Sequence, residues 1–203
     1  MKNNIGLILE GGGFRGCYTA GAMKWLHDNG IIMPYTVCIS AAAGYSLFYL
    51  GDDIDDLHTF STKAIKDSHV LGLIPLLRER ALVGYGWLEE KIIKPVYEKL
   101  MTNIRNNNAE LEIGIYNMSK QQLQFKGTDL TSGNSKYIKA SCTLPLTGHM
   151  VNINGDKYLD GGIEVMICTE RAREKGYQKQ LVIVTKDKNY VRKPNGFFID
   201  FLM

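Results

Sequence analysis

Hydrophobic residues fall into short continuous runs near the N-terminus of the chain. Residues 5–9 (IGLIL) and 35–39 (YTVCI) are apolar runs bounded by turn-forming residues, which is typical of strands buried on both faces. Between them, residues 15–29 carry apolar side chains at helical spacing, and Gly30 predicts the end of that helix. Residues 41–50 predict a helix buried on most sides. This order of strand, helix, strand and helix predicts parallel strands joined by right-handed crossovers.

The rest of the chain alternates amphipathic helices with strands. Two helical faces are predicted, formed by Leu57, Phe60, Ala64 and Ile65 in the first and by Leu88, Ile92, Val96 and Leu100 in the second. The second helix is expected to break before Pro95, and the polar residues 103–110 predict a loop. Residues 111–118 and 122–126 predict paired strands, and residues 180–185 a last buried strand. The alternation predicts an α/β layered fold with one domain over residues 1–203.

Charge and cysteine content narrow the class of protein. The chain has 24 basic and 21 acidic residues, a net charge of +3, which is too small to indicate nucleic-acid binding. The basic cluster at residues 186–193 is expected to be a solvated surface rather than a phosphate-binding patch. Four widely spaced cysteines predict neither a disulfide framework nor a zinc site, and they favour a cytoplasmic protein. The longest apolar stretch, residues 41–50, is about half a membrane span.

A glycine-rich turn follows the first predicted strand. Residues 11–16 (GGGFRG) place backbone N–H groups at the start of a helix, where they form a site for negative charge. The same residues fit the G-x-G-x-x-G dinucleotide fingerprint, which keeps a nucleotide-binding module as one alternative. That fingerprint requires an acidic residue at the end of the second strand, but Ser40 stands there. A serine between a strand and a helix is typical of a nucleophile elbow.

A nucleophilic serine needs an oxyanion hole and a base. The glycine turn on the neighbouring strand can supply the hole. Asp160 is the candidate base, because Gly161 and Gly162 after it allow a tight turn that would hold its carboxylate in place. The alternatives without a catalytic role are a helix N-cap for Ser40 and an ordinary turn residue for Asp160. None of the histidines has a partner at suggestive spacing; they are His27, His58, His69 and His149.

These pieces in this order resemble the patatin-like phospholipase family. The resemblance rests on residues 11–16, on Ser40 and on residues 160–162 (DGG), and residues 140–162 (ASCTLPLTGHMVNINGDKYLDGG) resemble that family's approach to its aspartate. It covers nearly the whole chain. It implies a three-layer α/β/α fold with a mainly parallel central sheet and a serine–aspartate dyad without a histidine. The implied activity is hydrolysis of phospholipid or lysophospholipid esters, with no metal or cofactor.

The resemblance also assigns roles to single residues. Ser40 would be the nucleophile and Asp160 the base. The residues carried over for the oxyanion hole are Gly11, Gly12, Gly13 and Arg15. Among them, Gly12 and Gly13 would donate backbone N–H groups and Gly11 would shape the loop. Arg15 would brace the loop or add positive charge.

The sequence departs from the family pattern at four positions and at its end. The family elbow is G-x-S-x-G, but Cys38 and Ala42 flank Ser40 here, which predicts a tighter turn and a slow enzyme. Val165 replaces an aspartate that the family tends to carry, and Cys168 stands where a proline is usual. The chain also ends early after its last predicted strand and is expected to lack a C-terminal helical segment. A weakened or inactive relative that binds lipid or a partner is therefore the main alternative.

The segment at residues 69–80 (HVLGLIPLLRER) has two interpretations. Its apolar residues are broken by Gly72 and Pro75, and it closes with basic residues. We expect a buried connection packed on the core. The alternative is an exposed flap in transient contact with a membrane surface, with Arg78 and Arg80 near the headgroups. The sequence carries no prediction of oligomeric state.

Overall fold

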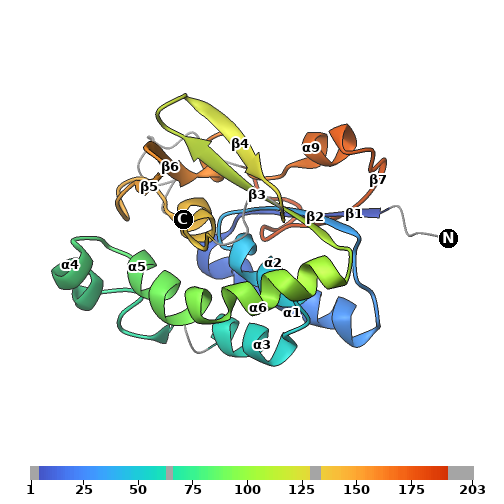
Figure 1. Ribbon diagram of the computed structural model, residues 1–203, viewed down its shortest axis with the longest axis horizontal. Coiled ribbons are helices and arrows are strands. Elements are labelled where there is room, and N and C mark those ends of the chain that lie inside the picture. Colours follow the sequence, from blue (N-terminus) through green and yellow to red (C-terminus); the bar gives the residue numbers. More distant parts are fainter. Residues whose placement is uncertain (1–4, 63–65, 129–133, 192–203) are drawn as a thin grey trace.

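The predicted strands assemble into one sheet (Figure 1). The computed structural model describes residues 5–62, 66–128 and 134–191. Its strands run in the order β5-β6-β3-β2-β1-β7, with β4 paired to β3. The strands are β1 (Ile5–Leu9), β2 (Tyr35–Ile39), β3 (Glu110–Asn117), β4 (Gln122–Lys126), β5 (Val151–Ile153), β6 (Asp156–Asp160) and β7 (Lys179–Ile183). Strands β7, β1, β2 and β3 are parallel, whereas β4 and β6 each pair antiparallel with β3, and β5 pairs antiparallel with β6.

Strands β2 and β6 meet end to end along one edge of β3. The last residue of β2, Ile39, is opposite Gly114 of β3. The next residue of β3, Ile115, is opposite Asp160, the last residue of β6. Strand β4 pairs with the same part of β3 and so occupies its other edge. The carboxyl ends of β2 and β6 are therefore brought together, with Ser40 directly after one and Asp160 at the end of the other.

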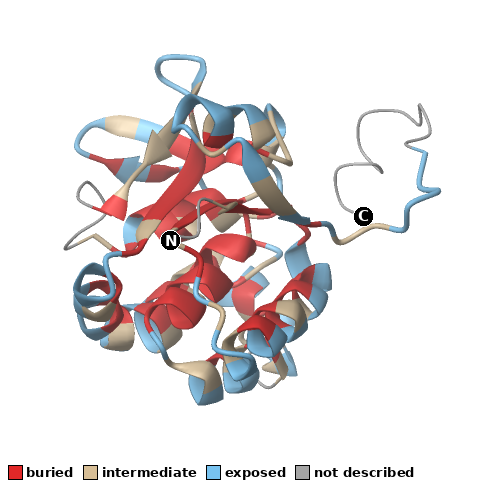
Figure 2. Ribbon diagram, turned by 90° about the vertical axis from the view of Figure 1, so that its right-hand side faces the viewer, coloured by how far each residue is buried: buried red, intermediate tan, exposed pale blue. Residues whose placement is uncertain are grey.

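Helices cover the two faces of the sheet unequally. On one face lie α1 (Gly16–Asp28), α2 (Ala42–Leu50), α3 (Ile54–Thr62) and α6 (Lys94–Asn106), and on the other the short α9 (Thr169–Glu174) (Figure 1). The remaining helices are α4 (Leu73–Glu79), α5 (Tyr85–Leu88) and α8 (Lys136–Cys142), with the π-helical turn η3 (Glu89–Ile93) and the 3₁₀ turns η1 (Gly13–Arg15) and η4 (Gly161–Ile163). The larger core lies between the sheet and α1, α2 and α6, and a smaller one lies under α9 (Figure 2). The expected three layers are confirmed.

Most of the predicted elements are confirmed, and two differences have physical causes. The residues predicted as a polar loop, 103–110, begin inside α6, which runs on to Asn106 because Leu100 and Ile104 continue its buried face. The expected break before Pro95 takes the form of η3, which leads directly into α6. The predicted helix face ending at Ala64 and Ile65 is confirmed as far as Thr62, and the last two positions lie outside the described residues.

The segment at residues 69–80 is not the buried connection that we expected. It forms α4, whose Leu73 and Leu77 are 74% and 80% exposed, and Pro75 is the buried residue of that helix. The apolar sequence was misleading because no other element packs over these leucines among the described residues. None of the helices in the described part of the chain is both long and apolar enough to cross a membrane.

Candidate active site

Ser40 forms a sharp turn between β2 and α2. Its backbone φ is 62°, in the left-handed region that non-glycine residues rarely adopt, and α2 begins two residues later. This is the geometry of a nucleophile elbow, which lifts a serine above the end of a sheet. Ser40 is 5% exposed. Its side chain makes no capping hydrogen bond to α2, whose N-cap is Ala41, so the N-cap interpretation does not hold.

Residues at the end of α8 hold the elbow in place. The backbone N–H of Ser40 donates to Ser141 Oγ at 2.9 Å, and that hydroxyl donates to the carbonyl of Gly114 at 2.8 Å. The Cys142 thiol donates to the carbonyl of Ser40 at 3.4 Å. Ser141 thus links the elbow to β3 in the buried interior. Sequence reasoning did not single out Ser141, and its only signal was the small-residue run at 140–142.

Asp160 is buried beside the elbow at the end of β6. It is 1% exposed, and its Oδ1 accepts the backbone N–H of Gly162 at 2.8 Å, which caps η4. Its Oδ2 has no hydrogen-bond partner among the described residues. Burial raises the pKa of Asp160 to about 7, and interactions with the Ser40 hydroxyl and the Gly162 N–H oppose that rise. The Ser40 hydroxyl is therefore near enough to favour the carboxylate, although the hydrogen bond between them is not formed. Such bonds commonly tighten only when substrate binds.

The glycines after Asp160 allow η4 to cross β3 closely. A Cβ on Gly161 would lie 2.8 Å from the carbonyl carbon and oxygen of Gly114, which are backbone atoms that cannot move aside. Gly114 is constrained in the same way, because a Cβ there would meet Ile39. Close backbone contact thus places Asp160 against the end of β2.

The glycine loop lies against the elbow and presents two N–H groups. A Cβ on Gly11 would be 2.9 Å from the Cβ of Ser40, so the loop and the elbow are in contact. The N–H of Gly11 donates to the carbonyl of Met166 at 3.3 Å and is used in the fold. No acceptor for the N–H groups of Gly12 and Gly13 is found within the described part of the chain. Gly13 has a φ of 52°, which favours glycine. These two N–H groups are therefore left to bind a group outside the described residues.

The other residues of the loop anchor it or lie at its margin. Glu10 is buried and accepts hydrogen bonds from the backbone N–H and hydroxyl of Thr185, directly after β7. A Cβ on Gly12 would collide with that threonine side chain. Arg15 ends η1, is exposed and lines the cavity described next.

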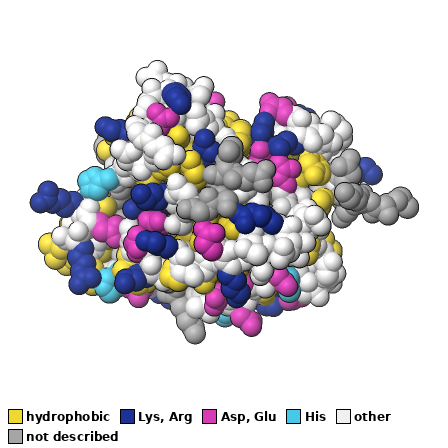
Figure 3. Space-filling view, viewed as in Figure 1, with side chains coloured by type: hydrophobic (Ala, Val, Ile, Leu, Met, Phe, Trp, Pro, Cys, Tyr) yellow, Lys and Arg dark blue, Asp and Glu magenta, His cyan; other side chains and the backbone are white. Residues whose placement is uncertain are grey.

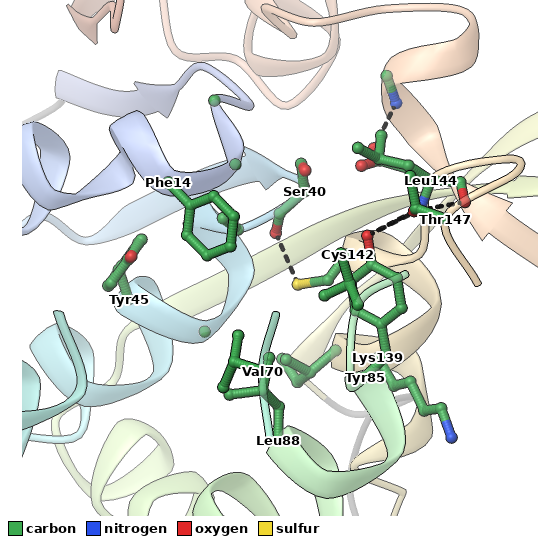
Figure 4. Close-up of a pocket in the computed structure, with 18 of the residues that line it drawn as sticks. Phe14, Ser40, Tyr45, Val70, Tyr85, Leu88, Lys139, Cys142, Leu144 and Thr147 are labelled. Carbon is green, nitrogen blue, oxygen red and sulfur yellow. Dashed lines mark hydrogen bonds between the residues drawn. The ribbon is translucent and has the colours of Figure 1, made fainter. Parts of the chain in front are cut away.

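A cavity of about 530 Å³ opens beside the elbow (Figure 4). Ser40, Asp160, Gly12 and Gly13 line one part of it. Elsewhere its walls are mainly apolar, and they include Phe14, Tyr45, Val70, Tyr85, Leu88 and Leu144. Figure 4 shows Phe14 and Cys142 on either side of Ser40, with Val70 and Leu88 across the cavity. This shape and chemistry suit a chain of methylene groups whose carbonyl end reaches Ser40.

The four departures from the family pattern are accommodated by the fold. Cys38 and Ala42 lie in the larger core, and the elbow forms with both of them present. Cys168 is buried in the smaller core, and Val165 packs against it. The Cβ atoms of Cys38 and Ala42 therefore do not prevent the sharp turn at Ser40.

The histidines of the described residues form their bonds away from Ser40 and Asp160. His27 contacts Asp52, His69 contacts Asp67, and His149 contacts the carbonyl of Glu79. His58 has no bond to Ser40 or Asp160 either. Within the described residues, no group of three or more His, Cys, Asp or Glu is arranged to hold a metal ion.

Comparison with known proteins identifies one family and a solved structure with a similar fold. The sequence profile of the family described as patatin-like phospholipase matches residues 7–168. The crystal structure of VipD from Legionella pneumophila is similar, with a TM-score of 0.55 and 18% identity. The similar region covers 88% of this chain and 49% of that one, so the chain spans about half the length of this neighbour, and the likeness is one of fold. No curated protein matches the sequence.

Proposed function

This chain belongs to the patatin-like phospholipase family, and from that premise we propose that it hydrolyses phospholipid or lysophospholipid esters with a Ser40–Asp160 dyad. Membership replaces the dinucleotide-binding interpretation of the glycine loop. One observation carries the proposal: β2 and β6 meet on the same edge of β3, where Ser40, at a φ of 62°, directly follows β2 and the buried Asp160 ends β6. The weakened relative remains the competing outcome of the test below.

The first half of the reaction would form an acyl-enzyme. Asp160 Oδ2, which has no partner among the described residues, would take the proton of Ser40 Oγ as that oxygen attacks the acyl carbonyl carbon. The carbonyl electrons would move onto its oxygen, and the N–H groups of Gly12 and Gly13 would stabilise the resulting negative charge. As the carbonyl re-forms, the ester bond would break, and the proton on Asp160 would pass to the departing alcohol oxygen.

The second half would release the fatty acid. Asp160 would accept a proton from a water molecule as the water oxygen attacks the acyl carbon on Ser40. The tetrahedral species would collapse by breaking the bond to Ser40 Oγ, which regains its proton from Asp160. A pKa near 7 suits both steps, because the carboxyl group must accept and donate a proton in turn. The apolar cavity would hold the acyl chain throughout.

The test is hydrolysis by the purified chain of a soluble p-nitrophenyl ester and a lysophospholipid. We expect the parent to hydrolyse both and Ser40→Ala to hydrolyse neither. Ser46→Ala is the matched control, because Ser46 is a buried serine of α2 whose hydroxyl donates to the carbonyl of Ala42 and forms no hydrogen bond with Ser40 or Asp160 among the described residues. Turnover that survives Ser40→Ala would contradict the proposal, and a folded but silent parent would establish the weakened relative.

A further inference from the structure

Exposed leucines gather on one segment beside the cavity. We call residues 70–83 the flap, with α4 at its tip. Five exposed large hydrophobic side chains fall within it; they are Leu71, Leu73, Leu76, Leu77 and Leu82. Scattered single leucines on a surface need no explanation, but a contiguous apolar patch marks an interaction site.

The flap is held in this exposed position by bonds at its two stems. Leu71 forms a bridge with Val83, and the N–H groups of Leu82 and Val83 both donate to the carbonyl of Thr147. The Glu79 carboxylate accepts the backbone N–H groups of Gly86 and Trp87 at 2.8 and 2.9 Å. The exposure of the leucines is thus part of the fold.

The apolar surface of the flap continues into the cavity. Both stems line it, through Val70 and Leu71 on one side and Leu82 and Val83 on the other. Val70 faces the same space as Ser40 in Figure 4. Because Leu71 and Leu82 are also exposed, an apolar path runs from the outer surface of the flap toward the nucleophile.

Positive charge flanks the leucines. Arg78 and Arg80 are exposed, and neither forms an ion pair within residues 5–62, 66–128 and 134–191. The acidic residue between them, Glu79, is turned inward by its bonds to the start of α5. Figure 3 shows Lys and Arg side chains around hydrophobic ones at the end of the molecule where α4 lies.

We propose that the flap docks the protein onto an anionic phospholipid bilayer. Leu73 and Leu77 enter the boundary of the acyl chains, while Arg78 and Arg80 bind the headgroup phosphates. A second copy fits this surface less well, because a two-fold contact would bring the arginines of the two flaps together. The inference rests on the proposed function in one respect: the docked flap places the cavity mouth at the layer that supplies the ester.

Vesicle flotation of the Ser40→Ala protein tests docking without turnover. Vesicles of phosphatidylcholine with phosphatidylglycerol are compared with vesicles of phosphatidylcholine alone. Adding Leu73→Asp and Leu77→Asp should weaken partition at least about tenfold, because exposed leucines are replaced by charges. Adding Arg78→Gln and Arg80→Gln instead should remove the preference for anionic vesicles and its sensitivity to salt. Trp25→Asp is the matched control, since Trp25 is 61% exposed on α1 and lies outside the flap.

The outcomes separate docking from catalysis. In otherwise native protein, the leucine pair should leave soluble-ester turnover unchanged, because neither side chain lines the cavity. Equal vesicle binding by the parent and the leucine variant overturns the inference, as does a parent that does not bind. Loss of self-association in sedimentation, with vesicle binding unchanged, would assign the flap to a second copy instead. Flap-dependent binding by a protein with no esterase activity would sustain docking and defeat only the proposed function.

Discussion

The elbow and the flap line the same cavity, but they are built in opposite ways. The elbow is buried, with Ser40 5% exposed and its backbone N–H and carbonyl bonded to Ser141 and Cys142 of α8. The flap exposes its leucines and is held by bonds at its stems and by the bonds of Glu79 to Gly86 and Trp87. Under the proposed function, the buried end of the sheet would position the reacting groups, and the exposed segment would bring the cavity to the membrane surface. Variants of the two regions should therefore fail in different assays.

Replacing Asp160 by asparagine should have the largest effect, and only on the elbow side of the comparison. We expect kcat to fall by a factor of about 10² or more on every ester, because a positioned base is lost. Vesicle binding should be unchanged. The asparagine side chain is isosteric, keeps an acceptor for Gly162 N–H and removes a buried charge, so the urea midpoint at pH 8 should not fall. His149→Ala is the control; loss of turnover there, with Asp160→Asn active, would replace the dyad by a triad.

The pH profile should report the buried carboxyl directly. Burial raises the pKa of Asp160 from 3.8 to about 7, so kcat/KM should fall about tenfold for each pH unit below that value. Native Asp160 holds its proton between about pH 4 and 7, where the unfolded chain releases it. Asp160 therefore makes the free energy of unfolding decrease as pH rises through that window. A soluble ester gives the first curve and urea unfolding of Ser40→Ala the second; an activity midpoint near 4 would refute the buried base.

Alanine at Gly13 should sharpen the comparison by damaging only the oxyanion donors. The φ of 52° disfavours a side chain although the space is open, so the substitution should turn the backbone N–H out of line. One such donor is worth about 10²–10³ in kcat, and KM should change much less. Gly21→Ala in α1 is the matched control, because a Cβ there also meets open space but at helical φ. A raised KM with normal kcat would indicate a plain binding loop.

Ser141→Ala should give the smallest of these effects and tests whether the elbow is positioned from α8. It leaves the Ser40 N–H and the Gly114 carbonyl without their partner, which should cost about 1–3 kcal/mol of stability. A small displacement of the nucleophile should also lower kcat about ten- to a hundredfold. Ser46→Ala removes a buried hydroxyl bond within α2 and leaves the bonds of Ser141 to Ser40 and Gly114 in place. Equal loss of stability with unchanged kcat would make Ser141 structural only.

The sequence predicted the parts of this site that depend on local pattern. The apolar runs of β1 and β2, the glycine loop and the serine after β2 are all local features, and each lies where expected. The meeting of β2 and β6 on one edge of β3 is a long-range register that no local pattern contains. Ser141 was missed for the same reason, since its hydroxyl bonds to the backbone of Ser40, which is 101 positions earlier in the chain.

The flap shows that a local pattern can also predict burial wrongly. Apolar composition predicts burial, but burial depends on whether another element covers the segment. Leu73 and Leu77 are uncovered within the described part of the chain, while Pro75 between them is buried. At Cys38 and Ala42 the turn forms with both side chains packed in the larger core, and the slow turnover expected from them stays a prediction. Neither outcome can be obtained from the residue types alone.

Covalent labelling by a fluorophosphonate tests the central claim most directly. The reagent should attach to the native protein, and peptide mapping should locate it on Ser40. Labelling should be absent in Ser40→Ala, at least about tenfold slower in Asp160→Asn, and unchanged in the Leu73→Asp, Leu77→Asp protein, because a small soluble reagent does not need the flap. Attachment to another serine, or equal labelling of native and Ser40→Ala protein, would contradict the account.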